Sequence, residues 1–149
     1  MNTAPADDPC RFLTHRVLRH APQAVYAAFA DADALARWWG PAGFRNEFHR
    51  FEFREGGRWH FDMIGPDGRR WANQSEFLRL VPDRQVVLRH DCAPFFTFTA
   101  TLDAVEGGTR LTWDQVFDDA DTARAVRAIV GDANEQNLDR LERVLAGTA

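Results

Sequence analysis

Lysine is absent from this chain of 149 residues, so all 18 of its basic side chains are arginine. The absence excludes mechanisms that need a lysine amine: a Schiff base, a pyridoxal attachment point or the lysine of a phosphate-binding loop. Serine is almost as scarce, since Ser75 is the only one and no Gly-x-Ser-x-Gly sequence surrounds it. Hydrolases built on that motif are therefore excluded as well.

Long apolar runs, a basic surplus and a disulfide framework are also missing. No segment approaches the roughly 20 apolar residues of a membrane span, and the N-terminal segment lacks the pattern of a signal peptide. A net charge of −4 gives no general attraction to nucleic acid or to acidic membranes. Two cysteines, Cys10 and Cys92, are too few for a disulfide framework. These absences predict a cytoplasmic protein that contacts neither nucleic acid nor membrane.

The chain shows no recognisable cofactor or metal motif. None of the five histidines falls at metal-ligand spacing, and the two cysteines lie far apart in the sequence. The pairs Gly56-Gly57 and Gly107-Gly108 indicate turns or bulges rather than a nucleotide-binding loop. The sequence therefore predicts neither a cofactor nor a metal site, and it identifies no catalytic group.

What is present is a pattern of strands and turns between helical segments. Residues 1–9 show no periodicity and predict a flexible leader, and residues 10–149 predict a single domain. Helical spacing begins at Pro22, and a second short helix is expected to end at Trp38. Seven strands are expected at residues 10–20, 44–54, 58–64, 69–80, 85–90, 95–103 and 109–117.

The remainder of the chain predicts one long C-terminal helix, with Gly131 as a point where it could kink or divide. Its expected apolar stripe consists of Ala123, Val126, Ile129, Val130, Leu138, Leu141 and Leu145. Strands joined by tight turns pair as antiparallel neighbours, and a sheet of about seven strands curls. The sequence therefore predicts an α+β fold of order β-α-α-β6-α, with a curved antiparallel sheet wrapped around the C-terminal helix.

Several short motifs occur in a characteristic order along residues 12–146. They are Trp38-Trp39-Gly40-Pro41, Glu52-x-Arg54-x-Gly56-Gly57, Pro66-Asp67-Gly68, Pro82-x-x-x-Val86, Gly107-Gly108-Thr109-x-Leu111-Thr112, and the closing leucines 138, 141 and 145. In this respect the chain resembles the SRPBCC or START-like superfamily, which has the helix-grip fold. Within that superfamily it resembles the branch related to the activator of the ninety-kilodalton heat-shock chaperone's ATPase.

The sequence departs from that branch in two places. A glycine usual after the Pro66-Asp67-Gly68 turn is replaced around residues 73–75, and a Gly-Trp pair is absent near residues 134–136. The resemblance implies that both segments lie near the wall or mouth of a cavity. The ligand of any relative therefore cannot be transferred to this chain, and these segments are where its own specificity is expected.

The aromatic residues suggest a binding cavity between sheet and helix. Side chains that point inward from a strongly curved sheet cannot all reach one helix, so some are expected to line a pocket. Each aromatic has the alternative role of core packing, and the adjacent Trp38 and Trp39 fit either a pocket wall or a core plug. The candidate ligand-binding residues are Trp38, Trp39, Phe61, Trp71, Asn73, Ser75, Phe98 and Trp113.

Polar residues leave a catalytic alternative open. His60 and Asp62 share one strand face and fit an acid/base pair, to which Asn73 and His90 could belong, but a solvent-facing sheet surface has the same pattern. Three functions follow: binding of a small hydrophobic molecule, a co-chaperone-like interaction with a chaperone ATPase, or a cyclase, dehydratase or hydrolase. Binding without a reaction is the preferred hypothesis, and a homodimer is compatible with the architecture.

Overall fold

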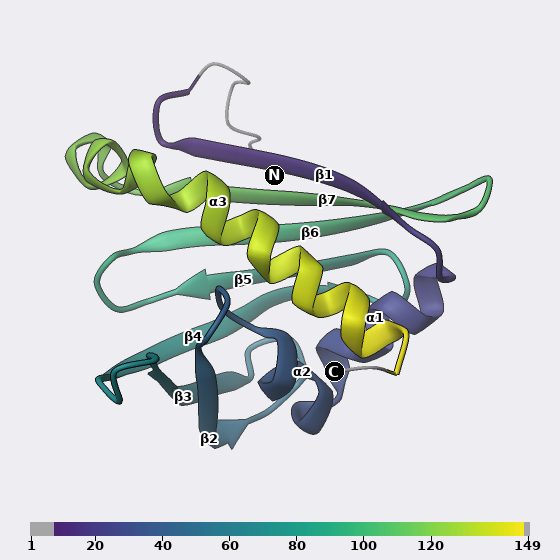
Figure 1. Ribbon diagram of the computed structural model, residues 1–149, viewed down its shortest axis with the longest axis horizontal. Helices are drawn as coiled ribbons and strands as arrows, with labels where there is room; N and C mark the ends of the chain where they lie inside the picture. Colours follow the sequence, from purple (N-terminus) through teal and green to yellow (C-terminus); the bar gives the residue numbers. More distant parts are fainter. Residues whose placement is uncertain (1–7, 148–149) are drawn as a thin grey trace.

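A computed structural model describes residues 8–147, in which one antiparallel sheet bends around a long C-terminal helix (Figure 1). This arrangement confirms the predicted helix-grip fold. Most of the expected leader, residues 1–7, lies outside the described residues. The elements in chain order are β1 (Arg11–Leu18), α1 (Pro22–Ala30), α2 (Ala32–Trp38), β2 (Arg45–Phe51), β3 (Arg58–Ile64), β4 (Arg70–Val81), β5 (Gln85–His90), β6 (Phe96–Val105), β7 (Gly108–Phe117) and α3 (Ala120–Leu145).

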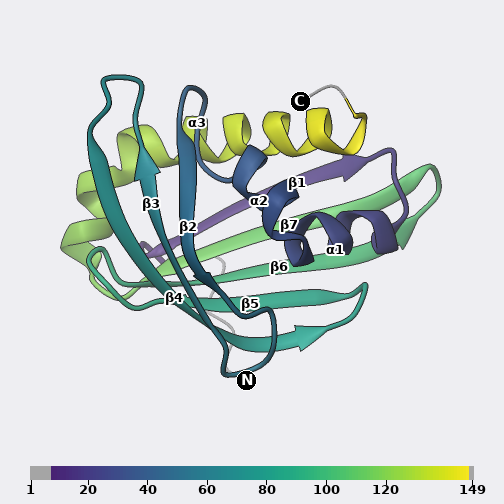
Figure 2. The same ribbon diagram turned by 90° about the horizontal axis from the view of Figure 1, so that it is seen from below.

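The strand order β1-β7-β6-β5-β4-β3-β2 follows from a chain of hairpins, with β1 returning to pair with β7. Figure 2 shows the sheet bending so that β2, β3 and β4 rise toward the level of α3. The helices α1 and α2 close the side of the sheet's concave face near the end of α3 (Figure 2). Among the described helices, none combines the length and the apolar character that a membrane span requires.

Two bulges decide which side chains face the inside of the curved sheet. The register of β2 against β3 shifts at His49, so Phe48 and Phe51 both pack on the core although they lie three residues apart. The register of β4 against β5 shifts at Leu78, whose side chain is left 46% exposed. A bulge inserts one residue and increases the local twist, so both irregularities favour the bend of the sheet.

The helix ends follow from local capping. Pro22 opens α1 at a position where its missing N–H removes no helical bond. The Asp31 carboxylate accepts from the Asp33 and Ala34 amides to begin α2, and Asp119 accepts from the Thr122 amide to begin α3. The helix α3 runs unbroken through Gly131, so the division considered there does not occur.

One residue of the predicted apolar stripe on α3 points toward solvent instead of the sheet. Ile129 is 66% exposed, so its assignment to the stripe was wrong. The inward positions instead recur at Ala123, Val126, Val130, Asn134, Asn137 and Leu141. Ile129 precedes one of these positions directly and is rotated by about 100° around the helix axis, which turns it toward solvent.

Arg140 joins α3 to the segment that follows α2. Its guanidinium donates hydrogen bonds to the carbonyls of Arg37, Trp39, Gly40 and Pro41, at 2.9, 3.1, 2.9 and 3.0 Å. The last carbonyls of a helix lack partners within the helix, and a cation near them is favourable. One side chain therefore satisfies the C-terminal end of α2 and fixes the turn that leads into β2.

Gly57 allows the connection between β2 and β3 to fold tightly against β4. Its N–H donates to the Arg54 carbonyl at 2.8 Å, and its carbonyl accepts from the Phe77 amide at 3.0 Å. A Cβ atom at Gly57 would lie 2.1 Å from the Glu52 carbonyl oxygen. This contact explains the second glycine of the Glu52-x-Arg54-x-Gly56-Gly57 motif.

We expect Gly57→Ala to lower the free energy of unfolding by about 2 kcal/mol, because the turn must move to admit the methyl group. Gly131 has nothing within 4 Å of a Cβ built on it, which makes Gly131→Ala a matched control. That control is expected to raise stability by up to about 1 kcal/mol, since alanine is the better helix former. Chemical denaturation measures both, and a neutral Gly57→Ala would contradict the described turn.

Candidate functional site

A cavity of about 230 Å³ lies between the concave face of the sheet and α3. Its lining is rich in aromatic and aliphatic side chains, with a few amides, one hydroxyl and one imidazole. The lining residues are Trp39, Gly40, Pro41, Trp59, Phe61, Met63, Asn73, Ser75, Leu88, His90, Pro94, Phe96, Phe98, Trp113, Gln115, Val130, Ala133, Asn134 and Asn137. Apolar walls with a few convergent polar groups are typical of small-molecule sites.

The floor of the cavity is built from rows of residues that pair across neighbouring strands. One row runs from Trp59 on β3 through Ser75 and His90 to Phe96 on β6. Because directly paired residues in an antiparallel sheet have Cβ atoms about 5 Å apart, the hydroxyl of Ser75 lies between an indole and an imidazole. The next row runs from Leu88 on β5 through Phe98 on β6 to Gln115 on β7.

The roof is the middle of α3, and two asparagines connect it to the rest of the wall. Asn134 donates to the Gln115 side chain of β7 at 3.3 Å. Asn137 accepts from the Gly40 amide at 3.1 Å and donates to the Trp38 carbonyl at 2.7 Å. Their amides tie the helix to the sheet and to the end of α2, so the cavity has walls with fixed positions.

Six of the eight predicted ligand-binding residues line this cavity: Trp39, Phe61, Asn73, Ser75, Phe98 and Trp113. The chain leaves α2 at Trp39, whose ring stacks on Trp113 with centroids 5.5 Å apart. Both segments that depart from the related family contribute to the wall, through Asn73 and Ser75 on one side and Asn134 on the other.

Two of the predicted residues lie elsewhere. Trp38 is fully buried behind the cavity, where its indole N–H donates to the Ala28 carbonyl at 3.0 Å. Trp71 is 43% exposed at the end of β4 and packs on Phe44, with ring centroids 5.9 Å apart. The adjacent tryptophans therefore divide their roles, with one in the core and one in the cavity wall.

His90 is the one ionisable side chain among the described residues that line the cavity. It is 6% exposed and stacks on Phe96 with ring centroids 4.4 Å apart. Its Nδ1 lies 2.7 Å from the Pro94 carbonyl oxygen and its Nε2 lies 2.7 Å from Oδ1 of Asn73. The Asn73 amide nitrogen in turn donates to the Trp71 carbonyl at 3.0 Å.

This hydrogen-bond chain through His90 ends on a backbone carbonyl at each side, and both ends are acceptors. A neutral imidazole carries one N–H. Because the Pro94 carbonyl can only accept, that N–H must be on Nδ1. Nε2 is then an acceptor facing the Oδ1 acceptor of Asn73. Turning the amide around relieves that contact, but it sets Oδ1 against the Trp71 carbonyl instead. Only the doubly protonated imidazolium satisfies every link of the chain.

Burial opposes that charged form. Removal from water lowers the pKa of His90 below its usual value of 6.5, against the smaller raising effects of the Pro94 carbonyl and Asp91. The unfolded chain therefore takes up a proton more readily than the folded one. Stability contributed by neutral His90 is present above about pH 6.5 and is lost as the pH falls through the folded-state pKa.

We expect the free energy of unfolding to decline as the pH falls below about 6.5, and to decline less in His90→Gln, because glutamine has no proton to take up. His49→Gln is the matched control, since that ring is exposed on the opposite face of the sheet. Urea denaturation across this pH range measures the effect. Parallel curves for the wild type and His90→Gln would contradict a buried neutral imidazole.

Several hydrogen-bond donors of the cavity lining have no partner in the part of the chain that the structure describes. The indole N–H groups of Trp59 and Trp113 are buried and have no hydrogen-bond partner within residues 8–147. The hydroxyl of Ser75, a residue 2% exposed, forms no hydrogen bond with the described residues. A buried donor without a partner costs about 1–3 kcal/mol, and indole nitrogens donate only. The lining therefore has unused donors, and one of them, the Ser75 hydroxyl, belongs to the residue that pairs with His90 across the strands.

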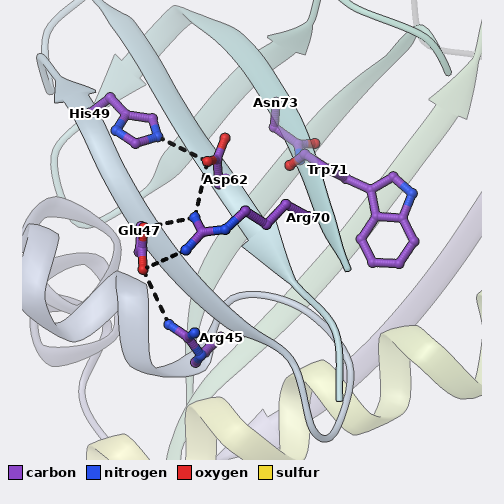
Figure 3. A network of polar contacts seen from close by, with 7 residues as sticks. All are labelled: Arg45, Glu47, His49, Asp62, Arg70, Trp71 and Asn73. Carbon is purple, nitrogen blue, oxygen red and sulfur yellow. Dashed lines mark hydrogen bonds and ion pairs between the residues drawn. The ribbon is translucent and has the colours of Figure 1, made fainter. Parts of the chain in front are cut away.

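The proposed acid/base pair of His60 and Asp62 lies outside the cavity, on the convex face of the sheet. His60 accepts from the Arg58 guanidinium at 3.3 Å. Figure 3 shows Arg70 between Asp62 and Glu47, with its guanidinium 3.2 Å from the Asp62 carboxylate, while Asn73 and Trp71 extend away from this network. Alternation along each strand separates His60 and Asp62 from His90, so the three cannot act on one ligand.

Comparison with known proteins identifies the family and the fold. The family model described as activator of Hsp90 ATPase homolog 1-like protein matches residues 19–146. A search of curated proteins found no match. A protein from Nitrosomonas europaea has a similar structure with a TM-score of 0.87 at 17% identity, covering 98% of this chain and 100% of that one.

Two further solved structures resemble this one. A protein from Chromobacterium violaceum superposes with a TM-score of 0.80 at 27% identity, covering 90% of this chain and 96% of its own. The AHSA1 protein from Silicibacter pomeroyi superposes with a TM-score of 0.74 at 19% identity, covering 93% and 99%. At these identities the similarity establishes a shared fold over nearly the whole length of each chain.

Proposed function

The chain belongs to the activator of Hsp90 ATPase homolog 1-like family, and from that premise we propose that it binds a small apolar or aromatic molecule in the cavity between the sheet and α3. The observation that supports this most is the cavity itself, with rings from four elements facing one space. Burial of apolar ligand surface is favourable by about 25 cal/mol per Å². A site of this composition therefore gains affinity from shape and burial.

The volume limits the size of the ligand. An engineered cavity of about 150 Å³ with an apolar lining binds benzene. The present cavity of about 230 Å³ thus holds one ring with a short substituent, or an aliphatic chain of similar bulk. A fused polycyclic ligand requires α3 to move away from the sheet.

Binding rather than catalysis agrees with the lining. An acid/base mechanism needs two groups with separate proton affinities near the reacting atoms. Within residues 8–147, the lining offers His90 alone, and its two ring nitrogens face the Pro94 carbonyl and the Asn73 amide at 2.7 Å each. Its polar groups suit recognition of one end of a ligand.

Native mass spectrometry, together with tryptophan fluorescence, tests the proposal against a library of single-ring arenes and short-chain lipids. Trp39, Trp59 and Trp113 line the cavity, so a bound ligand is expected to change their emission. A complex of one ligand per chain supports the proposal. Absence of any complex and of any emission change at millimolar concentration would refute it.

A second candidate is stimulation of a chaperone ATPase, which the description of the matching family suggests. This function requires a surface that contacts another protein rather than an occupied cavity. An ATPase assay of the chaperone with and without this protein distinguishes the two. No stimulation at excess protein would exclude it, whatever the result of the ligand library.

A further inference from the structure

We propose that the ligand of this cavity is a small carboxylic acid with an aromatic or aliphatic body, and that His90 takes up one proton when the acid binds. The inference rests on the proposed binding function and specifies the chemistry of its polar end. It derives from two features of the cavity wall. The first is the hydrogen-bond chain through His90, which is one proton short when the imidazole is neutral. The second is the group of donors on Ser75 and Trp59, which have no acceptor within residues 8–147.

The missing proton is at Nε2 of His90. Without an anion beside it, a neutral imidazole donates to the Pro94 carbonyl, and Nε2 then meets the Asn73 amide oxygen at 2.7 Å without a proton between them. Protonation completes the chain from Pro94 to the Trp71 carbonyl. What opposes protonation is the burial of a positive charge, which an anion in the same cavity would offset.

The donors that need an acceptor belong to the same cross-strand row as His90. Ser75 stands opposite His90 on one neighbouring strand and opposite Trp59 on the other, and within residues 8–147 neither its hydroxyl nor the Trp59 indole N–H has a hydrogen-bond partner. A carboxylate has two oxygens that only accept. Placed over Ser75, it meets unused donors and stands beside the imidazolium that neutralises it.

Other charged groups near His90 do not replace this anion. Asp91 follows it in the chain, but the Asp91 carboxylate is paired with Arg58 at 2.7 Å on the convex face. Arg89 precedes it and is paired with Asp118. The Cys92 sulfur lies 3.5 Å from Nε2, and a thiol is a weak donor. The two strands beside β5 present Asn73, Ser75 and Phe96 to the ring.

Binding of the acid has a defined proton balance. Near neutral pH the free acid is already a carboxylate and His90 is neutral, so the bound pair of carboxylate and imidazolium requires one proton from solvent. A neutral amide of the same shape requires none. The acid should therefore bind more tightly as the pH falls toward the usual pKa of histidine, whereas the affinity of the amide should stay constant.

Isothermal titration calorimetry with 3-phenylpropionate and hexanoate tests this, with 3-phenylpropanamide and hexanamide as neutral counterparts. Titrations at about pH 7.5 in buffers of different ionisation enthalpy are expected to give about one proton taken up per acid and none per amide. The acids are expected to bind about tenfold more tightly at about pH 6.5 than at pH 7.5. In His90→Gln the uptake and the pH dependence should both disappear.

A second measurement uses the wild-type protein and so does not depend on whether a variant folds. In nitrogen-15-labelled wild-type protein, the Nε2 resonance of His90 should move to the position of a protonated nitrogen when the acid is added, and not when the amide is added. Cys92→Ala is the control for the neighbouring thiol and should leave the shift unchanged.

The outcomes separate the two proposals. Equal binding of acid and amide without proton uptake overturns this inference but leaves the cavity as a binding site. Proton uptake that persists in His90→Gln also overturns it, since another group then titrates. If acids, amides and simple arenes all fail to bind, the proposed binding function fails together with the inference.

Discussion

Replacing Ala133 with phenylalanine is expected to weaken ligand binding by at least about 100-fold, which corresponds to roughly 2.7 kcal/mol. Ala133 lies on the roof of the cavity, where α3 faces the sheet. A phenyl ring added there takes up most of a space of about 230 Å³, since about 150 Å³ suffices for benzene. The added ring occupies the place of the ligand.

The measurement is titration of the tightest binder from the ligand library into both proteins by calorimetry. Ala128→Phe is the matched control, because residue 128 is exposed on the same helix and the same atoms are added outside the cavity. Thermal unfolding of Ala133→Phe checks that the fold is retained. Wild-type affinity in a folded Ala133→Phe would show that the ligand binds elsewhere.

Replacing Arg140 with methionine is expected to lower the free energy of unfolding by about 3 kcal/mol. Methionine keeps the apolar stem of the side chain but removes the donors for four carbonyls around the end of α2. Hydrogen bonds to a charged donor contribute about 1.5–3 kcal/mol each, and partly buried carbonyls that lose them remain poorly solvated. The loss is concentrated where α2 meets α3.

Chemical denaturation measures this loss, with Arg124→Met as the control. Arg124 is an exposed residue of the same helix that pairs with Asp121 one turn away, so its removal should cost less than about 0.5 kcal/mol. Arg140→Met should also weaken ligand binding, since Trp39, Gly40 and Pro41 line the cavity. Equal stability of the two variants would contradict the role of Arg140 as the link between the helices.

Much of the fold follows from local sequence signals. Alternation along residues 96–103 and the turn residues between strands predict the hairpins, because each strand buries one face and each tight turn needs glycine, proline or aspartate. The β3 and β5 boundaries coincide with the prediction. The C-terminal helix is also predicted, but the exposure of Ile129 is not. A helical pattern alone does not reveal how far the sheet extends beneath the helix.

The candidate site was only partly predictable. Family resemblance drew attention to Asn73 and Ser75, and both line the cavity. The place of His90 beside Ser75 depends on the pairing of β4 with β5, and the bulge at Leu78 shifts that register without any distinctive residue. The pairing of Nδ1 with the Pro94 carbonyl is likewise a matter of loop conformation, which composition does not encode.

The different positions of Trp38 and Trp39 also depend on local backbone conformation. An adjacent pair on a helix points in directions about 100° apart, so the sequence predicts that the two differ without saying which faces the cavity. The helix ends at Trp38, and the extended backbone at Trp39 turns its ring onto Trp113. A boundary of one residue therefore decides which tryptophan forms the wall.

Intermolecular nuclear Overhauser effects between unlabelled toluene and the carbon-13-labelled protein test most directly whether an apolar molecule is held between the sheet and α3. Toluene needs only the apolar lining, so the result does not depend on His90. The cavity predicts contacts from the toluene protons to the Phe98 and Trp113 rings and to the Ala133 methyl group. Contacts confined to Trp71 and Phe44 at the end of the sheet, or none at saturating toluene, would contradict it.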